Sequence, residues 1–165
     1  MKAITLLGTS NKGKTDTLKK FIKLLLANKA ECKAIEGVSR IPSFITPKRL
    51  DRIDKYNDIS IKVAFMNRCI GITTHGDRVD ILKDKFNLLS NCDYFICASH
   101  PDHETLSYVI EVDTKHSPIV INQRIVNICD IGDSLADCQE KSNSKMADQL
   151  FMILVNELNK TCLTK

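Results

Sequence analysis

Residues 8–15 constrain the fold of this chain more than any other segment. They read Gly-Thr-Ser-Asn-Lys-Gly-Lys-Thr and fit the pattern G-x-x-x-x-G-K-[ST] at every specified position. Glycine at positions 8 and 13 allows backbone angles that strain other residues, so successive N–H groups can turn toward a phosphate. Lys14 can reach the β- and γ-phosphates, and the Thr15 hydroxyl can bind Mg²⁺. The segment therefore predicts a phosphate-binding loop.

The segments on either side of this loop have the pattern that such a loop requires. Residues 3–7 form a short apolar run that is typical of a buried strand. From about 15 to 27, apolar residues recur every three or four positions, as on one face of a helix. The start of that helix would direct its positive dipole end at the anion. The residues predicted to bind the triphosphate are Gly8, Thr9, Ser10, Asn11, Lys12, Gly13, Lys14, Thr15 and Asp16.

The stretch ITLLGTSNKGKTDTL resembles the start of the P-loop nucleoside triphosphate hydrolase superfamily. The later segments CIGITTHGD and CDYFICASHPDHET resemble small bacterial P-loop ATPases of uncharacterised role, with a size and layout close to the nucleotide kinases. The resemblance covers most of the chain in arrangement, and the loop is its one specific motif. It implies an α/β fold in three layers, with a mainly parallel sheet flanked by helices and phosphates bound at the carboxyl ends of the strands.

The rest of the chain predicts one α/β domain over residues 1–165. Further strands are predicted at 59–65, 69–73, 93–98 and 118–122, and further helices at 77–89, 104–110 and 134–159. Because only Met66-Asn67-Arg68 separate the first two of these strands, we expect an antiparallel hairpin there. The polar segment 49–56 is a candidate short helix, and residues 123–132 fit no single element.

Magnesium in a P-loop site is usually held, through water, by an acidic residue at the end of a neighbouring strand. Asp77 follows a predicted strand across Gly76, which can bring the backbone close to a ligand. Asp77 would serve equally well as the N-cap of the next helix. Asp130 also follows an apolar run but comes late in the chain, and Asp93 begins its strand at the end away from the phosphates. The predicted magnesium ligands are therefore Thr15 and Asp77.

The segment 99–105 should lie on the same rim of the sheet as the phosphate-binding loop, where loops commonly carry catalytic groups. Asp102 or Glu104 could orient a water or accept a substrate proton, and His100 or His103 could contact a phosphate. Helix capping by the two acidic residues explains the same pattern. The predicted catalytic residues are Lys14, Asp102 and Glu104. The histidines lack a Cys or His pair elsewhere at ligand spacing, which argues against zinc.

Composition bears on the partner and the compartment. The net charge of +4 suits phosphate-bearing ligands, but it is too dispersed for a dedicated nucleic-acid surface. The seven cysteines form no C-x-x-C pair, and several lie in apolar runs, so we interpret them as free thiols of a reducing compartment. The apolar run near the N-terminus is too short for a signal peptide or a membrane span. We therefore expect a soluble cytoplasmic protein without a membrane partner.

Absent motifs narrow the function. The chain has no guanine-specific N-K-x-D or T-K-x-D, which favours ATP over GTP, and no L-S-G-G-Q signature of transporter ATPases. The leading hypothesis is a Mg²⁺-dependent ATPase or small-molecule phosphotransferase that uses ATP. The alternative is a nucleotide-dependent switch with little turnover that acts through a protein partner. A structural protein with a vestigial loop is a third hypothesis, and the intact Lys14 and Thr15 argue against it. The acceptor, the partner protein and the oligomeric state stay open.

Overall fold

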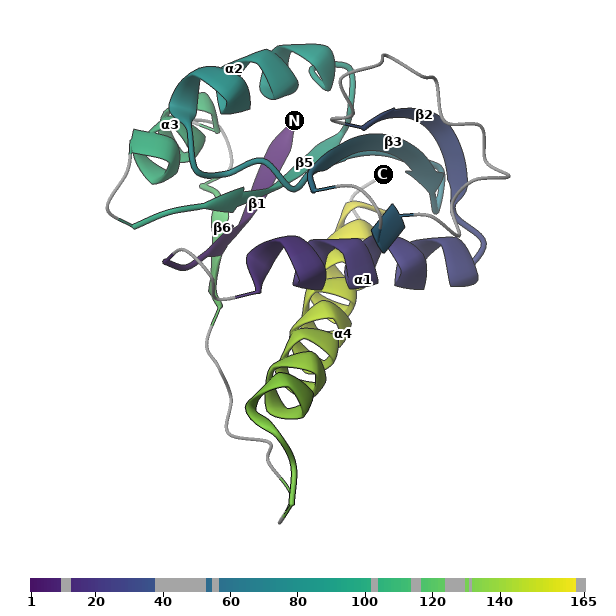
Figure 1. Cartoon of the computed structure of the whole chain (residues 1–165). Coiled ribbons are helices and arrows are strands. Elements are labelled where there is room, and N and C mark those ends of the chain that lie inside the picture. Colours follow the sequence, from purple (N-terminus) through teal and green to yellow (C-terminus); the bar gives the residue numbers. More distant parts are fainter. Residues whose placement is uncertain are drawn as a thin grey trace.

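The computed structural model describes residues 1–9, 13–37, 53–54, 57–101, 104–113, 117–123, 130 and 132–162. The described residues form one sheet with helices packed on its two faces (Figure 1). The strands are β1 (Lys2–Leu7), β2 (Glu31–Gly37), β3 (Ile59–Phe65), β4 (Arg68–Thr73), β5 (Tyr94–Ser99) and β6 (Ile119–Asn122). The helices are α1 (Lys14–Ala27), α2 (Val79–Leu88), α3 (Glu104–Val112) and α4 (Leu135–Cys162).

The sheet is mixed rather than mainly parallel. The strand order is β2-β3-β4-β5-β1-β6, and β4, β5, β1 and β6 pair in parallel. β3 runs antiparallel to both of its neighbours, β2 and β4. The α/β class is therefore confirmed, and parallel pairing is confined to one side of the sheet. In that parallel part, β5 lies between β1 and β4, so the carboxyl ends of the three strands are neighbours.

The antiparallel hairpin predicted over residues 59–73 is confirmed by the pairing of β3 with β4. The two strands are joined through Met66 and Asn67, whose φ angles are 49° and 59°. Positive φ at both central residues is the geometry of a two-residue turn that matches the twist of paired strands. β4 therefore returns directly beside β3, without a crossover helix.

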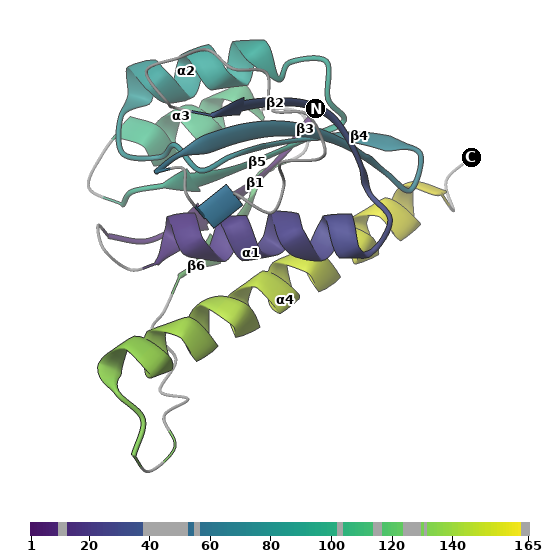
Figure 2. The same ribbon diagram turned by 45° about the vertical axis from the view of Figure 1, so that its right-hand side comes forward.

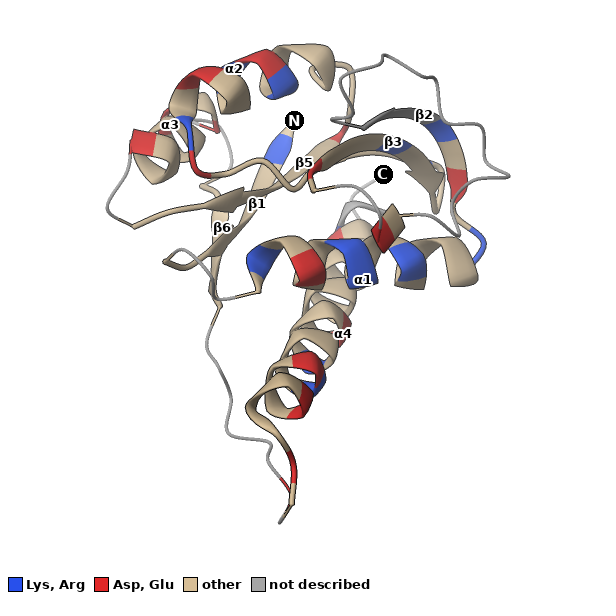
Figure 3. Ribbon diagram, in the orientation of Figure 1, with Lys and Arg blue, Asp and Glu red and all other residues tan. Residues whose placement is uncertain are grey.

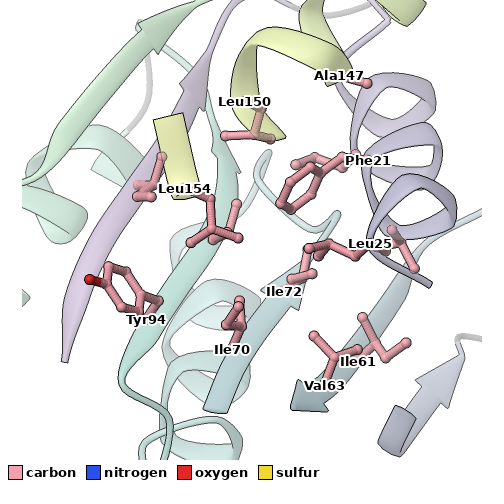
Figure 4. Packing of buried hydrophobic residues seen from close by; sticks show 14 of the residues in the cluster. Phe21, Leu25, Ile61, Val63, Ile70, Ile72, Tyr94, Ala147, Leu150 and Leu154 are labelled. Carbon is pink, nitrogen blue, oxygen red and sulfur yellow. The ribbon is translucent and has the colours of Figure 1, made fainter. Parts of the chain in front are cut away.

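The helices cover the sheet in two layers, with α1 and α4 on one face and α2 and α3 on the other (Figure 2). On the first face, Phe21 and Leu25 of α1 and Leu150 and Leu154 of α4 belong to one apolar cluster with Ile72 of the sheet (Figure 4). Burial of each such side chain stabilises the fold by about 1.5–3 kcal/mol. On the opposite face, residues of α2 and α3 pack against β1 and β5 in a smaller apolar cluster. The larger core, on the first face, holds α1, the helix that follows the phosphate-binding loop.

Strand β2 was not expected from the sequence. Its residues, ECKAIEG, include three charged side chains and only one β-branched residue, so they lack the apolar alternation that indicates a strand. Among the described strands, β2 pairs with β3 alone, at the edge of the sheet, with a register shift between Cys32 and Ala34. The candidate short helix at 49–56 lies, apart from Ile53 and Asp54, outside the described residues, as does most of 123–132.

The cysteines differ from the sequence interpretation at one position. Cys69, Cys92 and Cys97 carry free thiols, whereas Cys138 is disulfide-bonded. The expectation of free thiols throughout is therefore wrong, and it no longer supports a reducing compartment. Basic and acidic residues are interspersed along α1, α2 and α4 (Figure 3). In the part of the chain that the structure describes, no helix has both the length and the apolar character needed to cross a membrane.

Candidate functional site

The predicted phosphate-binding loop connects β1 to α1 across residues 8–13. Gly13 is the N-cap of α1 and adopts a left-handed conformation, with φ 79° and ψ 15°. Its carbonyl accepts the first helical hydrogen bond, from the Thr17 N–H at 2.8 Å. A side chain at position 13 would be strained by this φ and would also overlap the side-chain amide of Asn143. Two independent constraints therefore require glycine at this position.

Close approach of another segment, and not the backbone angle that we expected, favours glycine at position 8. Among the described residues, positive φ in glycine occurs at Gly13 and Gly132. The backbone angle therefore does not explain Gly8. A Cβ atom at position 8 would lie 3.1 Å from the Cβ of Gln123, which follows β6. Close approach of β6 to the loop is thus the constraint. Ser10, Asn11 and Lys12 lie outside the described residues.

The side chain of Lys14 folds back over the loop. Its Nζ donates hydrogen bonds to the carbonyl oxygens of Gly8, at 2.6 Å, and Thr9, at 2.9 Å. Only 7% of the residue is exposed. Burial lowers the pKa of Lys14 from its ordinary value, and the carboxylate of Asp77 partly opposes this by raising it. The Lys14 ammonium is thus held next to the loop and is poorly solvated, and an anionic group bound there would stabilise it.

Asp77 reaches this region because the chain after β4 crosses the end of β5. A Cβ atom at Gly76 would lie 2.5 Å from the backbone oxygen of Ala98, so the two backbones are in close contact. β5 in turn adjoins the loop, since the N–H of Gly8 donates to the Ser99 carbonyl at 3.1 Å. The effect of Asp77 on the pKa of Lys14 is consistent with this path. The structure therefore places Asp77, which the sequence assigned to magnesium, within electrostatic range of Lys14.

The alternative interpretation of Asp77 as a helix N-cap is wrong. The N-cap of α2 is Arg78, which is extended, with φ −130° and ψ 127°, and makes no side-chain cap hydrogen bond. Arg78 instead pairs with Asp80 at 2.5 Å. Asp77 precedes the cap and its side chain is exposed. Its carboxylate is thus not used to begin the helix.

Replacing Gly76 with alanine is expected to destabilise the protein by about 2–3 kcal/mol, because the new methyl group would overlap the backbone of β5. Urea unfolding followed by circular dichroism measures this loss. Gly132→Ala is the matched control. Gly132 has a φ of 102°, but a methyl group added there would meet no atom within 4 Å, so only backbone strain of about 1 kcal/mol applies. Equal losses in the two variants would contradict the close contact at Gly76.

Two amide side chains that the sequence analysis missed support the loop. Asn143 of α4 accepts hydrogen bonds at its Oδ1 from the Thr17 hydroxyl, at 3.3 Å, and from Gln123 Nε2, at 3.2 Å. Gln123 is also fixed by its backbone, whose N–H donates to the Leu7 carbonyl at 2.7 Å. The Oε1 atom of Gln123 is buried and has no partner among the described residues. No sequence motif indicated these residues; in the structure, Asn143 and its neighbour Ser142 lie on a buried face of α4.

The segment after β5 lies beside the loop, as its parallel pairing with β1 requires. The backbone N–H of His100 donates to the Thr105 hydroxyl at 3.0 Å, and His100 is buried. Glu104 is exposed at the first position of α3. Asp102 and His103 lie outside the described residues. Of the residues proposed for catalysis, the structure therefore places Lys14 in the loop and Glu104 on the surface at the start of α3.

The other acidic candidates have structural roles. Asp93 precedes β5, and its carboxylate accepts a hydrogen bond from the backbone N–H of Cys69, at 2.8 Å, at the amino end of β4. Asp130 forms an ion pair with Lys141, at 2.6 Å, next to α4. Both carboxylates are thus already engaged by groups of the protein.

A magnesium ion needs few protein ligands. Mg²⁺ is usually bound by one or two protein oxygens, with phosphates and waters completing six ligands. Thr15, at the second position of α1, and Asp77 provide such oxygens, while Asp16 is exposed in the first turn of the helix. Within the described ranges, no three His, Cys, Asp or Glu side chains gather as a metal site. The residues present therefore fit a metal held largely by a bound triphosphate.

Comparison with protein-family models, curated proteins and solved structures finds no match to this chain.

Proposed function

We propose that this protein binds ATP with Mg²⁺ at the loop of residues 8–15 and hydrolyses ATP or transfers its γ-phosphoryl group. The observation that carries the proposal is the position of Lys14, whose poorly solvated ammonium lies on the carbonyls of Gly8 and Thr9. A buried cation whose hydrogen bonds within the described part of the chain go to two neutral carbonyls is costly. A polyphosphate would supply the negative charge, and Lys14 would exchange two neutral acceptors for anionic oxygens.

The chemistry of the other groups in the proposed site suggests a role for each of them. The N–H groups at the start of α1 point toward the loop, and the positive end of the helix dipole favours an anion there. Lys14 neutralises charge on the transferring phosphoryl group. Thr15 would bind the metal directly, and Asp77 would hold it through water. A bound metal would supply positive charge that offsets the negative charge of the triphosphate.

The parallel part of the sheet supports a P-loop fold in the proposal. β4, β5 and β1 are adjacent and parallel, so the segments that follow them, which contain Asp77, His100 and Gly8, meet at one edge. Ligands of open α/β sheets bind at that edge. Asp102 and Glu104 follow β5 and are the proposed groups for orienting a water or an acceptor hydroxyl.

Calorimetry with ATP, GTP and ADP, each with and without Mg²⁺, tests the proposal, followed by phosphate release on the same sample. We expect Mg·ATP to bind with a dissociation constant below about 1 mM, with slow but measurable release of phosphate. ATP should bind more tightly than GTP. Binding without phosphate release would favour the nucleotide-dependent switch. Failure of all three nucleotides to bind would refute the proposed function.

A further inference from the structure

Two cysteine side chains lie in contact on the face of the sheet that α2 covers. The Sγ atom of Cys69, the second residue of β4, lies 3.0 Å from the Sγ atom of Cys92, in the turn before β5. This separation is shorter than the ordinary contact distance of two sulfur atoms and about 1 Å longer than a disulfide bond. The two residues are 23 positions apart in the sequence. No C-x-x-C spacing therefore indicated the pair.

The backbone holds the two sulfur atoms together. The N–H of Asp93 donates to the carbonyl of Cys69 at 2.8 Å, and the Asp93 carboxylate accepts from the Cys69 N–H at 2.8 Å. Gly71 leaves the space that the sulfur of Cys92 needs, because a Cβ atom there would lie 3.2 Å from it. The contact thus depends on the parallel register of β4 and β5 and on a glycine, and not on two side-chain rotamers alone.

We propose that Cys69 and Cys92 form a reversible dithiol–disulfide site whose oxidant is a low-molecular-weight disulfide. The site is independent of the proposed nucleotide function. It lies at the amino ends of β4 and β5, whereas the phosphate-binding loop follows the carboxyl end of β1, which is parallel to both strands.

The order of the two steps follows from exposure. Cys69 is partly exposed and can meet a reagent, whereas Cys92 is 4% exposed. Burial, together with the neighbouring Cys69, raises the pKa of the Cys92 thiol to about 12, while Lys62 partly opposes this. The thiol of Cys92 is therefore protonated and poorly accessible to a reagent from solution. Cys69 attacks first, and Cys92 acts as the resolving thiol.

The exchange balances without any other co-reactant. The Cys69 thiolate attacks one sulfur of the reagent, its S–S bond breaks, and one small thiol leaves with the proton that Cys69 had lost. The sulfur of Cys92 then attacks the Cys69 sulfur of the mixed disulfide, and the second small thiol leaves with the proton of Cys92. The two cysteines lose two electrons in total, and the reagent gains them. A small thiol in excess reverses both steps.

The native protein, incubated with glutathione buffers from fully reduced to fully oxidised, tests the site. The samples are quenched in acid, alkylated, digested with trypsin and analysed by mass spectrometry. We expect a crosslink between peptides 69–78 and 86–115 whose fraction rises at least tenfold across the series and falls again on return to reduced glutathione. Fragmentation of the second peptide separates Cys92 from Cys97, which is fully buried and lies 3.5 Å from the Thr5 hydroxyl.

Variants give the matched controls. Cys69→Ser and Cys92→Ser should each abolish the crosslink, and Cys32→Ser, at another half-buried cysteine, should retain it. A glutathione adduct that persists on Cys69 without a crosslink would overturn the proposal, as would a crosslink to Cys97. Complete and separate alkylation of both thiols in the fully oxidised buffer would do the same. The peptide map of the protein without substitutions still tests the proposed crosslink if a serine variant fails to fold.

Discussion

Replacing Lys14 with alanine should weaken Mg·ATP binding on the order of 100-fold and leave the fold intact. The ammonium would make charge-assisted hydrogen bonds to phosphate oxygens, each contributing about 1.5–3 kcal/mol. The variant removes them together. In the nucleotide-free protein the same change removes a cation whose burial is unfavourable, as the lowered pKa of Lys14 indicates. We therefore expect little change in the melting temperature. Calorimetric titration with Mg·ATP measures the loss.

Lys23→Ala is the control for this variant. Lys23 lies on α1, is half exposed, and forms an ion pair with Asp54 at 2.5 Å. Its removal takes away the same charge from the same helix and should change the affinity for Mg·ATP less than about threefold, since exposed ion pairs contribute little. If the Lys14 variant binds ATP as tightly as the Lys23 variant, the triphosphate is not bound through this loop.

Asp77→Asn should raise the magnesium concentration needed for half-maximal phosphate release by about 10- to 100-fold, the usual effect of losing an outer-shell carboxylate. The affinity for ATP without metal should change much less. A second readout uses pH. Because the Asp77 carboxylate raises the pKa of Lys14, its removal lowers that pKa further, so Lys14 loses its proton at a lower pH. Metal-free ATP binding should then weaken at a lower pH than in the unmodified protein.

Asp80→Asn is the matched control for Asp77→Asn. Asp80 lies three residues further on, in the first turn of α2, and is paired with Arg78. Its replacement should shift neither the magnesium titration nor the alkaline limit of ATP binding. An unchanged magnesium requirement in the Asp77 variant would show that another acid holds the metal.

The sequence predicted those features of the candidate site and the fold that residues close together in the chain determine. Lys14 and Gly13 belong to one short motif, and the left-handed conformation of Gly13 follows from the geometry that the motif requires. The hairpin of β3 and β4 was predicted because so few residues separate the strands. The expectation that Asp77 lies on the same edge as the loop came from a further rule, that parallel strands carry their carboxyl ends to one edge, and the effect of Asp77 on the pKa of Lys14 is consistent with it.

What could not be predicted depends on contacts between distant segments. Asn143 and Gln123 support the loop from α4 and from the end of β6, and neither lies in a motif. The role of Gly8 likewise comes from the approach of β6. β2 has a polar sequence but forms a strand because it pairs with the edge of β3. The roles of such residues depend on the space and the hydrogen-bond partners that tertiary packing provides. No local sequence pattern encodes these.

The hydrogen bond between Thr17 and Asn143 has a consequence for synthesis of the chain on the ribosome. The two residues are 126 positions apart, and α4 also supplies much of the core against which α1 packs. At a translation rate of about 5–20 residues per second, the segment that contains Asn143 follows the first helix by roughly 6–25 s. During that interval Gly13 and Thr17 lack their support, and β1 lacks β6. The nascent chain must therefore keep β1 and α1 from aggregating until α4 has emerged.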